Sequence, residues 1–262
     1  AGGGRRNKLA DFARVNRNGK IAMKPDEGDG IVAVKICSEQ DDILLTTGLG
    51  QCIRFAVPDV RVFSGRTSSG VRGIRLAKDD EVIAMGVLRH VDVTPAESRA
   101  YLKHAAAMRR ATDGEEVELS DDDEAVEDEA ALSPERLAEL GAAEQLIVTI
   151  ADNGMGKRAS AFDYRVTGRG GKGLIAHRLS KGQKLAQSFP VDEGDQVMLV
   201  TDAGQLIRTP VDQIRVAGRA TSGVWVLRTG EGERVVSVAR RVEEAEDDIE
   251  DGSENSGEAP AD

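Results

Sequence analysis

Apolar residues in this chain fall mostly into short runs separated by glycine-containing turns. Three blocks, at residues 42–54, 145–158 and 196–208, each hold an apolar run, a tight turn and a second short run. Asn153-Gly154 and the stretch 202–204 are typical of hairpin turns. β-Branched residues dominate the runs, and no apolar stripe with a 3.6-residue period reaches a useful length. The pattern therefore predicts β-hairpins over most of the chain.

These hairpins belong to longer internal repeats. Three stretches align without gaps and share the pattern Gly-Arg-x-x-x-Gly; they are residues 62–76, 165–179 and 215–229. An eroded copy at 14–24 has Gly19 in the last glycine position. The last glycines are 51 residues apart from Gly19 to Gly70, 103 from Gly70 to Gly173 and 50 from Gly173 to Gly223. The period is therefore about 50 residues, with one insertion of about 52 residues.

Each repeat also supplies an apolar run after its last glycine and another near its end. About four short strands in about 50 residues is the size of a propeller blade. We therefore predict an all-β, propeller-like ring of four-stranded blades, with about three and a half blades present at 1–91 and 146–242. Because the sequence opens on Ala-Gly-Gly-Gly midway through a repeat, we expect it to be an N-terminally truncated piece of a longer protein.

The segment 92–145 departs from the repeat. A capping box at 94–97 starts a helix that continues to about Arg110, and a second helix starts at 133–135 and stops near Gly141. We predict an inserted helical hairpin with an acidic loop. Four basic residues end the first helix: Lys103, His104, Arg109 and Arg110. We favour the interpretation that they complement the helix C-terminus; the alternative is that they hold the acidic loop or contact nucleic acid.

Charge is distributed unevenly along the chain. The chain has 35 Lys and Arg and 46 Asp and Glu, a net charge of −11. Residues 111–145 hold 14 acidic residues and one basic residue, and residues 243–262 hold 10 acidic residues and no basic one, so the remainder carries +12. We expect 243–262 to be a disordered acidic tail, because blocks of like charge repel and stay solvated. The two acidic segments either confer solubility or compete for whatever the basic body binds.

Several function classes are excluded. No run of 18 apolar residues could span a membrane, and no signal peptide precedes the repeats. Three scattered His and two Cys give no metal-ligand spacing, and we expect Cys37 and Cys52 to be buried thiols. The loop 168–173 matches G-x-G-x-x-G, but a strand follows it where a dinucleotide site needs a helix. Tyr101 and Tyr164 are not accompanied by a group of basic residues that would indicate a tyrosine nucleophile. No catalytic residue is predicted in this chain.

Basic residues recur at the same spacing as the glycines, which predicts that a polyanion binds along one rim of the ring. Such binding would use phosphate contacts and would have no sequence preference. The candidate DNA-binding residues are Arg54, Arg66, Arg72, Arg75, Arg158, Arg169, Lys172, Arg178, Arg208, Arg219 and Arg228. The candidate loop glycines are Gly65, Gly70, Gly168, Gly170, Gly171, Gly173, Gly218 and Gly223. The scarcity of aromatic residues favours duplex over single strands, and we expect the one Trp, Trp225, in the core rather than on a strand face.

The glycine loops, the runs 67–76 and 195–209 and the acidic tail resemble the C-terminal domain of the DNA gyrase A subunit over residues 8–91 and 146–242. The resemblance implies a β-pinwheel of about six blades with duplex DNA bent around its basic rim. That chiral wrap serves ATP-dependent negative supercoiling by a type IIA topoisomerase. It also implies partners in the rest of gyrase A and in gyrase B, within an A2B2 holoenzyme in the bacterial cytoplasm at the nucleoid. The cleavage tyrosine, magnesium and ATP would be used on other domains, so no cofactor is expected here.

The sequence departs from the family's pattern at one point, and two alternative interpretations of its function stay open. The family's box Gln-Arg-Arg-Gly-Gly-Lys-Gly belongs to a first blade that this sequence lacks, and residues 167–173 hold only a degenerate echo of it. The C-terminal domain of a topoisomerase IV subunit, with a related but shorter or degraded array, is the nearest relative in pattern. A protein-interaction propeller that does not bind DNA is the alternative from another functional class.

Overall fold

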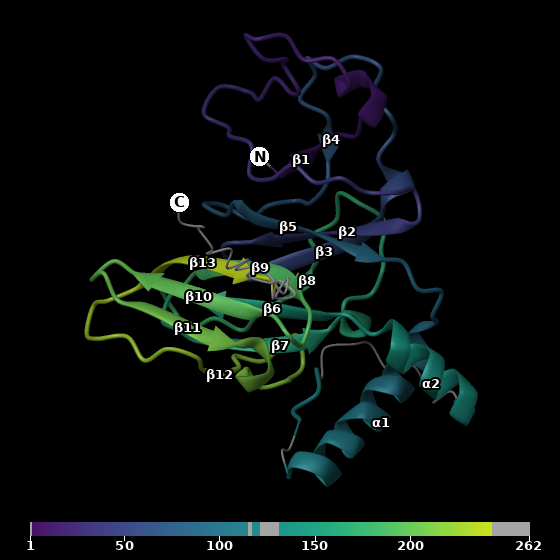
Figure 1. The fold of residues 1–262 in the computed structure, drawn as a ribbon, viewed down its shortest axis with the longest axis vertical. Helices are drawn as coiled ribbons and strands as arrows, with labels where there is room; N and C mark the ends of the chain where they lie inside the picture. The colour runs from purple at the N-terminus through teal and green to yellow at the C-terminus, as the bar shows by residue number, and fades with distance from the viewer. Residues whose placement is uncertain (1, 115–116, 121–130, 243–262) are drawn as a thin grey trace, which may run out of the picture.

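The computed structural model describes residues 2–114, 117–120 and 131–242, which form a stack of small antiparallel sheets with two helices at one end (Figure 1). The predicted acidic tail, 243–262, and most of the predicted acidic loop lie outside the described residues. In chain order the elements are β1 (Gly3–Gly4), η1 (Leu9–Phe12), β2 (Asp41–Thr47), β3 (Gln51–Ala56), η2 (Val57–Asp59), β4 (Val71–Arg72), β5 (Val82–Arg89), α1 (Pro95–Asp113), α2 (Pro134–Ala143), β6 (Leu146–Ala151), β7 (Met155–Ser160), η3 (Ala161–Asp163), β8 (Leu174–Ile175), β9 (Leu185–Val191), β10 (Gln196–Thr201), β11 (Leu206–Pro210), η4 (Val211–Gln213), β12 (Val224–Trp225) and β13 (Val235–Arg241).

Each repeat builds a sheet around one hairpin and one return strand. β2 lies between β3 and β5, β6 lies between β7 and β9, and β10 lies between β11 and β13. The fourth strand of the first two sheets is short and comes from the following repeat, since β8 pairs with β3 and β12 pairs with β7. The all-β, four-stranded blades are confirmed, but the prediction that one repeat supplies all four strands of its blade is wrong. The exchanged strand ties each blade to the next.

The exchange explains why the last glycine of each loop recurs. Gly173 has φ +80°, and a Cβ at this position would lie 2.1 Å from the carbonyl oxygen of Cys52 in the preceding blade. Gly70 and Gly223 have φ values of +96° and +73°, and each would place a Cβ 2.2 Å from a backbone carbonyl oxygen of the preceding blade. Only glycine combines this backbone conformation with so close an approach. The glycine period is therefore a property of how the blades join.

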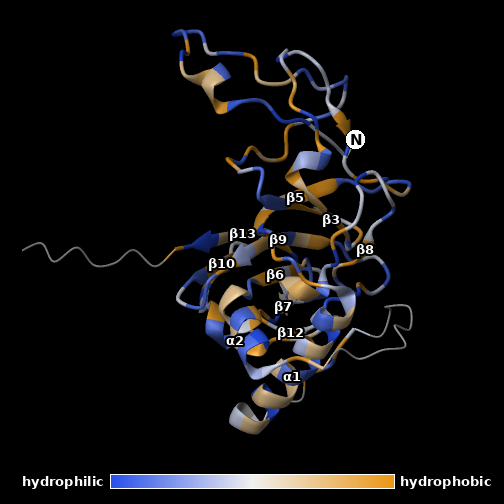
Figure 2. Cartoon of the chain, turned by 90° about the vertical axis from the view of Figure 1, so that its right-hand side faces the viewer, coloured by the Kyte–Doolittle hydropathy of each residue, from blue (hydrophilic) through white to orange (hydrophobic). Residues whose placement is uncertain are grey.

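The hydrophobic core lies between successive sheets rather than within one of them. In β6, Ile147 packs with Leu44 of the first sheet, whereas its neighbour Val148 packs with Val197 and Leu199 of the third. Successive residues of a strand point to opposite faces, so this central strand is buried along its whole length. Figure 2 shows the apolar strands stacked through the middle of the molecule, with hydrophilic segments mainly on the connecting loops. Val, Ile and Leu supply most of the buried side chains of this core.

The insertion contains the two predicted helices. Thr94 and Glu97 form the expected capping box of α1, and Ser133 caps α2. The hairpin is held to the second blade by an apolar contact in which the rings of Tyr101 and Phe162 meet edge to face, 5.2 Å apart, beside the fully buried Leu140. None of the helices among the described residues is long and apolar enough to cross a membrane.

The first part of the chain forms less regular structure than predicted. Residues 13–40 contain no strand, although Gly19 has the φ of +79° expected from its place in the eroded repeat. In later repeats the strand after this glycine pairs with a hairpin of the preceding repeat, and no such hairpin is present among residues 2–18. Cys37 is consequently exposed, so the prediction of a buried thiol is wrong for Cys37 and confirmed for Cys52.

Candidate nucleic-acid interface

The eleven cations predicted to contact DNA fall into two groups. Seven are exposed: Arg72, Arg75, Arg169, Lys172, Arg178, Arg208 and Arg228. Arg66 is half-buried. The other three, Arg54, Arg158 and Arg219, are buried with exposed fractions of 5%, 8% and 0%. A side chain enclosed in this way cannot reach a phosphate on the surface, so the assignment of these three residues to DNA is wrong.

Two of the buried arginines join consecutive blades. Arg54, in β3, donates from Nη1 to the carbonyl oxygen of Ala161 in the next repeat at 2.7 Å, and its Nη2 lies 2.8 Å from a carboxylate oxygen of Asp42. Arg158 occupies the same place in β7 and donates to the carbonyl oxygens of Ile214 and Asp212 at 2.5 and 2.8 Å. These arginines recur because the same contact between repeats recurs. They satisfy backbone carbonyl groups that the fold buries.

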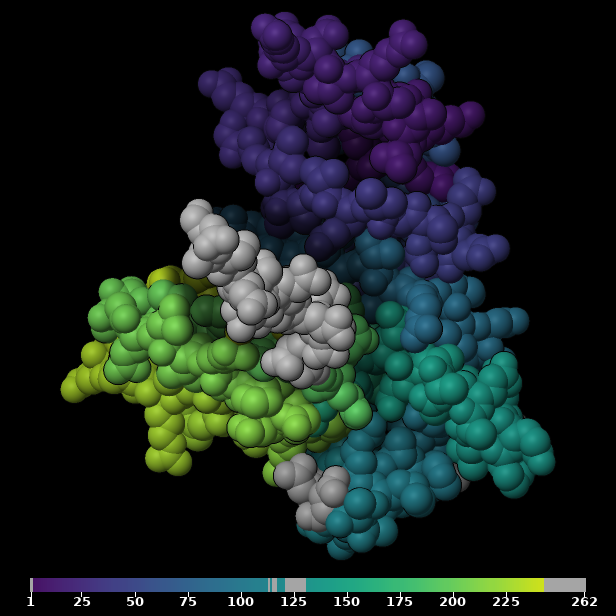
Figure 3. All heavy atoms as spheres, viewed as in Figure 1, coloured from purple at the N-terminus to yellow at the C-terminus, as the bar shows by residue number. Residues whose placement is uncertain are grey.

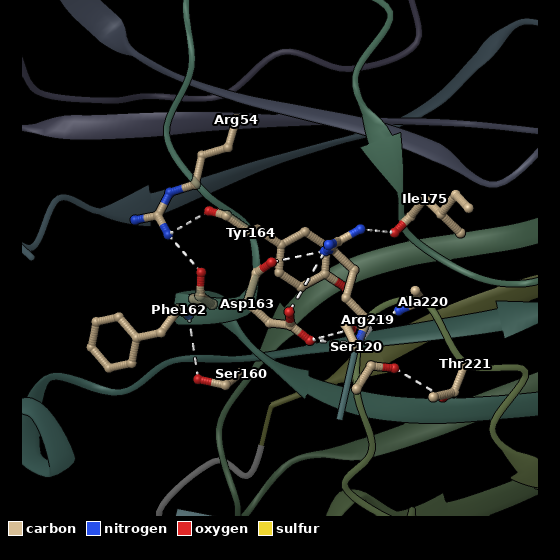
Figure 4. A network of polar contacts seen from close by, with 12 residues as sticks. Arg54, Ser120, Ser160, Phe162, Asp163, Tyr164, Ile175, Arg219, Ala220 and Thr221 are labelled. Atoms are coloured by element: carbon tan, nitrogen blue, oxygen red, sulfur yellow. Dashed lines mark hydrogen bonds and ion pairs between the residues drawn. The ribbon is translucent and has the colours of Figure 1, made fainter. Parts of the chain in front are cut away.

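The arginines of the Gly-Arg pairs form a second set of contacts between repeats. The Nη1 group donates to the carbonyl oxygen two residues beyond the last glycine of the preceding loop. The three pairs are Arg66 to Ile21 at 3.4 Å, Arg169 to Arg72 at 3.0 Å and Arg219 to Ile175 at 2.5 Å. Arg169 and Arg219 also donate from Nε to the carbonyl oxygens of Asp59 and Asp163, at 2.9 and 2.8 Å. Figure 4 shows this arrangement for Arg219. Packing between repeats thus accounts for the recurrence of the arginine in each Gly-Arg pair.

A buried polar cluster lies beneath the third glycine loop. The ammonium group of Lys157 is fully enclosed and donates to the carbonyl oxygens of Arg219, at 2.7 Å, and of Thr221. Burial lowers the pKa of Lys157 to about 7 and raises that of the Cys52 thiol to about 12. Because a buried thiol with so high a pKa is a poor nucleophile, Cys52 offers no chemistry here. The cluster fixes the loop that follows Gly218.

His177, at the edge of this cluster, gives a pH prediction. Its ring is 2% exposed, and its Nδ1 lies 3.0 Å from Thr149 Oγ1. Burial, followed by the nearby charge of Lys157, lowers the pKa of His177 from 6.5 to about 3. Between these values the unfolded chain binds more protons, so stability present above pH 6.5 is lost as the pH falls. The free energy of unfolding should fall between pH 7 and pH 4 in the unmodified chain. In His177→Gln we expect this fall to be smaller by about 2–3 kcal/mol. Urea unfolding at each pH measures both values.

His104 provides the control, because it is exposed on α1. His104→Gln makes the same substitution at an exposed side chain, so it separates the effect of burial from that of removing an imidazole. Parallel profiles for His177→Gln and the unmodified chain would contradict the prediction.

The exposed cations gather around the second glycine loop. Gly170 donates its N–H to the Gly73 carbonyl oxygen at 2.5 Å, and Gly171 accepts from the Arg75 N–H at 2.8 Å. The segment 71–75, which carries Arg72 and Arg75, is thereby held against the loop that carries Arg169 and Lys172. We call the exposed residues Arg72, Arg75, Arg169 and Lys172 the basic loop cluster. A hollow beside the same loop is lined by Arg165, which was not among the predicted residues although Arg215 recurs in phase with it.

Further expectations about individual side chains are corrected or refined by the structure. Trp225 is 50% exposed on β12, so its placement in the core is wrong and it lies on a strand face. Arg208 lies on β11, which no further strand covers among the described residues, and it donates to Gln196 Oε1. Near the end of α1, Arg109 contacts Glu144, directly after α2, at 3.1 Å, so this cation joins the C-terminal ends of the two helices.

The repeat segments of this chain match a known family. A family model described as "DNA gyrase C-terminal domain, beta-propeller" matches residues 1–38, 41–89, 145–192 and 195–240. These four segments cover most of the chain. The chain belongs to this family.

The gyrase family match follows the repeats closely. Its first segment includes the eroded copy around Gly19, and its gap from 90 to 144 contains α1 and α2. Two similar proteins are named as the A subunit of DNA gyrase. The chain is 52% identical over 248 residues to the DNA gyrase A subunit of Granulibacter bethesdensis, covering 91% of this chain and 26% of that protein. It is 41% identical to the DNA gyrase A subunit of Rickettsia bellii, covering 94% of this chain and 27% of that protein. The chain therefore spans about a quarter of the length of these gyrase proteins.

Solved structures agree on the fold. The structure of a DNA gyrase A C-terminal domain has a TM-score of 0.62 and 18% identity, covering 92% of this chain and 63% of that one. The C-terminal domain of DNA topoisomerase IV has a TM-score of 0.66 and 16% identity, covering 91% and 58%. At such identities the likeness concerns the fold alone, so it does not separate gyrase from topoisomerase IV. The family model and the named gyrase relatives make that distinction.

Proposed function

We propose that this chain binds duplex DNA and bends it across the exposed loops of successive blades, as the wrapping domain of DNA gyrase. The observation that carries the proposal is the basic loop cluster, which places four exposed cations around one glycine loop of a body whose net charge is +12 once the two acidic segments are set aside. Glycine loops let a phosphate approach closely, and Arg and Lys supply the charge.

Binding of this kind has a characteristic energetic cost. Bending a duplex smoothly costs on the order of 1–6 kcal/mol per 20–30 bp, so several phosphate contacts must offset it. Contacts to the sugar-phosphate backbone carry no sequence information, so binding would tolerate any sequence and would weaken steeply with salt. The bent duplex would then present a neighbouring segment for strand passage, giving the chiral wrap of ATP-dependent negative supercoiling.

The remaining parts of this function lie outside the chain. We propose that it acts with gyrase B and with the rest of gyrase A in an A2B2 holoenzyme of the bacterial cytoplasm. ATP, magnesium and the cleavage tyrosine would be used there. The role of this chain would be to position DNA.

Neutralising the basic loop cluster tests the proposal. We expect the triple variant Arg72→Gln, Arg75→Gln, Lys172→Gln to weaken duplex binding about tenfold or more at 50 mM salt and to reduce the salt slope by about two to three. Arg169 is left in place because its guanidinium group also contacts the neighbouring blade. Binding is measured by titration with a random-sequence duplex at several salt concentrations, with DNA topology read out on circular plasmid.

A second triple variant provides a control of equal charge. Lys78, Lys181 and Lys184 are exposed on the turns before the return strands, away from the glycine loop in sequence. Their replacement by Gln should have a clearly smaller effect. Equal losses in the two variants would show that net charge alone governs binding. Affinity that stays flat between low and moderate salt would reject DNA binding and favour a propeller that docks proteins.

A further inference from the structure

The second and third glycine loops have the same sequence pattern but differ in burial. In the second loop, residues 166–171 are exposed or half-buried. In the third loop, the equivalent residues 216–221 are all buried, with Gly218 at their centre. Loops of one repeat family on adjacent blades should be equally accessible unless something covers one of them.

The covering segment comes from the insertion. Residues 117–120, which we call the strap, lie against the third loop about one hundred residues away in sequence. The backbone carbonyl oxygen of Glu118 accepts the N–H of Gly218 at 2.7 Å. The hydroxyl of Ser120 donates to Asp163 at 2.9 Å and accepts the N–H of Ala220 at 3.1 Å (Figure 4). The strap thus occupies backbone N–H groups of the loop that an anion would otherwise approach.

The fit between strap and loop is specific to the third repeat. A Cβ added to Gly218 would lie 2.7 Å from the Glu118 carbonyl oxygen and 2.7 Å from the Ser120 nitrogen. A Cβ added to Gly168 or Gly65, the equivalent glycines, would meet nothing within 4 Å. At the third loop, glycine is therefore required by the strap and not by the turn itself.

The strap also brings negative charge to a basic site. Glu118 lines a hollow beside the third loop together with Arg178 and Arg215. The equivalent hollow beside the second loop is lined by Arg165 and Arg54 and by no acidic residue. In Figure 3 the insertion, in blue to teal, lies at the lower end of the molecule, beside the later blades in green. Glu118 thus adds a negative charge to a hollow that a phosphate would enter if DNA followed both loops alike.

We propose that the strap is an intramolecular competitor of DNA, which closes the third glycine loop until a duplex displaces it. The inference rests on the proposed DNA binding and goes beyond it by naming the loop that is closed and the residues that close it. Because the second loop stays open, a duplex would engage the basic loop cluster first. The extra surface would become available only after the strap leaves.

Two variants open the strap by different means. Gly218→Ala adds a methyl group where the strap backbone lies, and Ser120→Ala removes the hydroxyl that joins Asp163 to Ala220. Gly168→Ala is the matched control, since it makes the same change in an open loop. Amide hydrogen exchange of residues 117–120 and 216–221 reports opening, and titration of a random-sequence duplex at several salt concentrations reports binding. Both are measured on the full chain and on a whole gyrase A protein that carries it.

We expect both opening variants to exchange faster at the strap and the loop and to bind duplex DNA about three- to tenfold more tightly at low salt, with a salt slope steeper by about one. Gly168→Ala should not speed exchange at the strap or at the third loop, because no strap lies against Gly168. In the unmodified chain, adding duplex DNA should itself speed exchange at 117–120. Faster exchange with unchanged affinity would show that the strap only anchors the insertion, and unchanged exchange in both variants would overturn the closed loop. Absence of binding in every form would instead reject the proposed function, while exchange would still report the strap.

Discussion

Replacing Arg219 by Met is expected to lower the free energy of unfolding by about 3–5 kcal/mol, because the change leaves the buried carboxylate of Asp163 without its nearest cation. Arg219 is fully buried and Asp163 is 8% exposed. The guanidinium group of Arg219 donates to the carbonyl oxygens of Asp163 and Ile175. Its Nε atom also lies 3.8 Å from a carboxylate oxygen of Asp163. All three groups would lose a hydrogen-bonding or charge partner in a site that water does not reach.

The matched control is Arg169→Met, which removes the same type of contact from the preceding repeat. Arg169 donates to the same two carbonyl positions, but it is exposed, so water can replace it. We expect a loss of no more than about 1 kcal/mol. Urea unfolding followed by circular dichroism measures both variants, with the midpoint and the slope compared. Similar losses at the two positions would mean that burial does not set the strength of this contact.

The sequence was sufficient to predict the repeat, the blades and the helical insertion, because each leaves a local signal. A period of about 50 residues, hairpin turns and the capping box at Thr94 are all readable without knowing the fold. Burial of the in-phase arginines is not readable in this way. A cation that contacts DNA on every blade and a cation that joins every blade to the next have the same spacing, so the exposed Arg228 and the buried Arg219 look alike in sequence.

Contacts between distant segments were also beyond the sequence. The strand after each glycine loop could be predicted, but its pairing with the preceding blade depends on the packing of whole repeats. The contact of Ser120 with Ala220 has no local pattern at all. Trp225 alternates with apolar neighbours like a core residue, yet β12 pairs only at one edge of the second sheet and leaves the ring half-exposed.

The hairpin turns offer the sharpest test of how blades are joined. Gly154 and Gly204 occupy the same turn in successive repeats and have nearly the same φ, +85° and +84°. The carbonyl oxygen of Gly154 accepts the N–H groups of Val226 and Leu227 at 3.0 and 3.1 Å, and a Cβ on Gly154 would lie 2.0 Å from the carbonyl oxygen of Leu227. A Cβ on Gly204 would meet nothing within 4 Å. The two positions therefore differ only in whether a following repeat packs against the turn.

We expect Gly204→Ala to lower the free energy of unfolding by about 1–2 kcal/mol, which is the cost of a left-handed backbone in a residue with a Cβ. Gly154→Ala should cost at least about 2 kcal/mol more, because the added methyl group would push β12 away from β7 and break the hydrogen bonds that join the last two blades. Urea unfolding gives both values, and hydrogen exchange at 224–227 should rise in Gly154→Ala alone. Equal costs would mean that backbone strain alone sets the glycine period, and that the exchanged strand contributes little to holding the blades together.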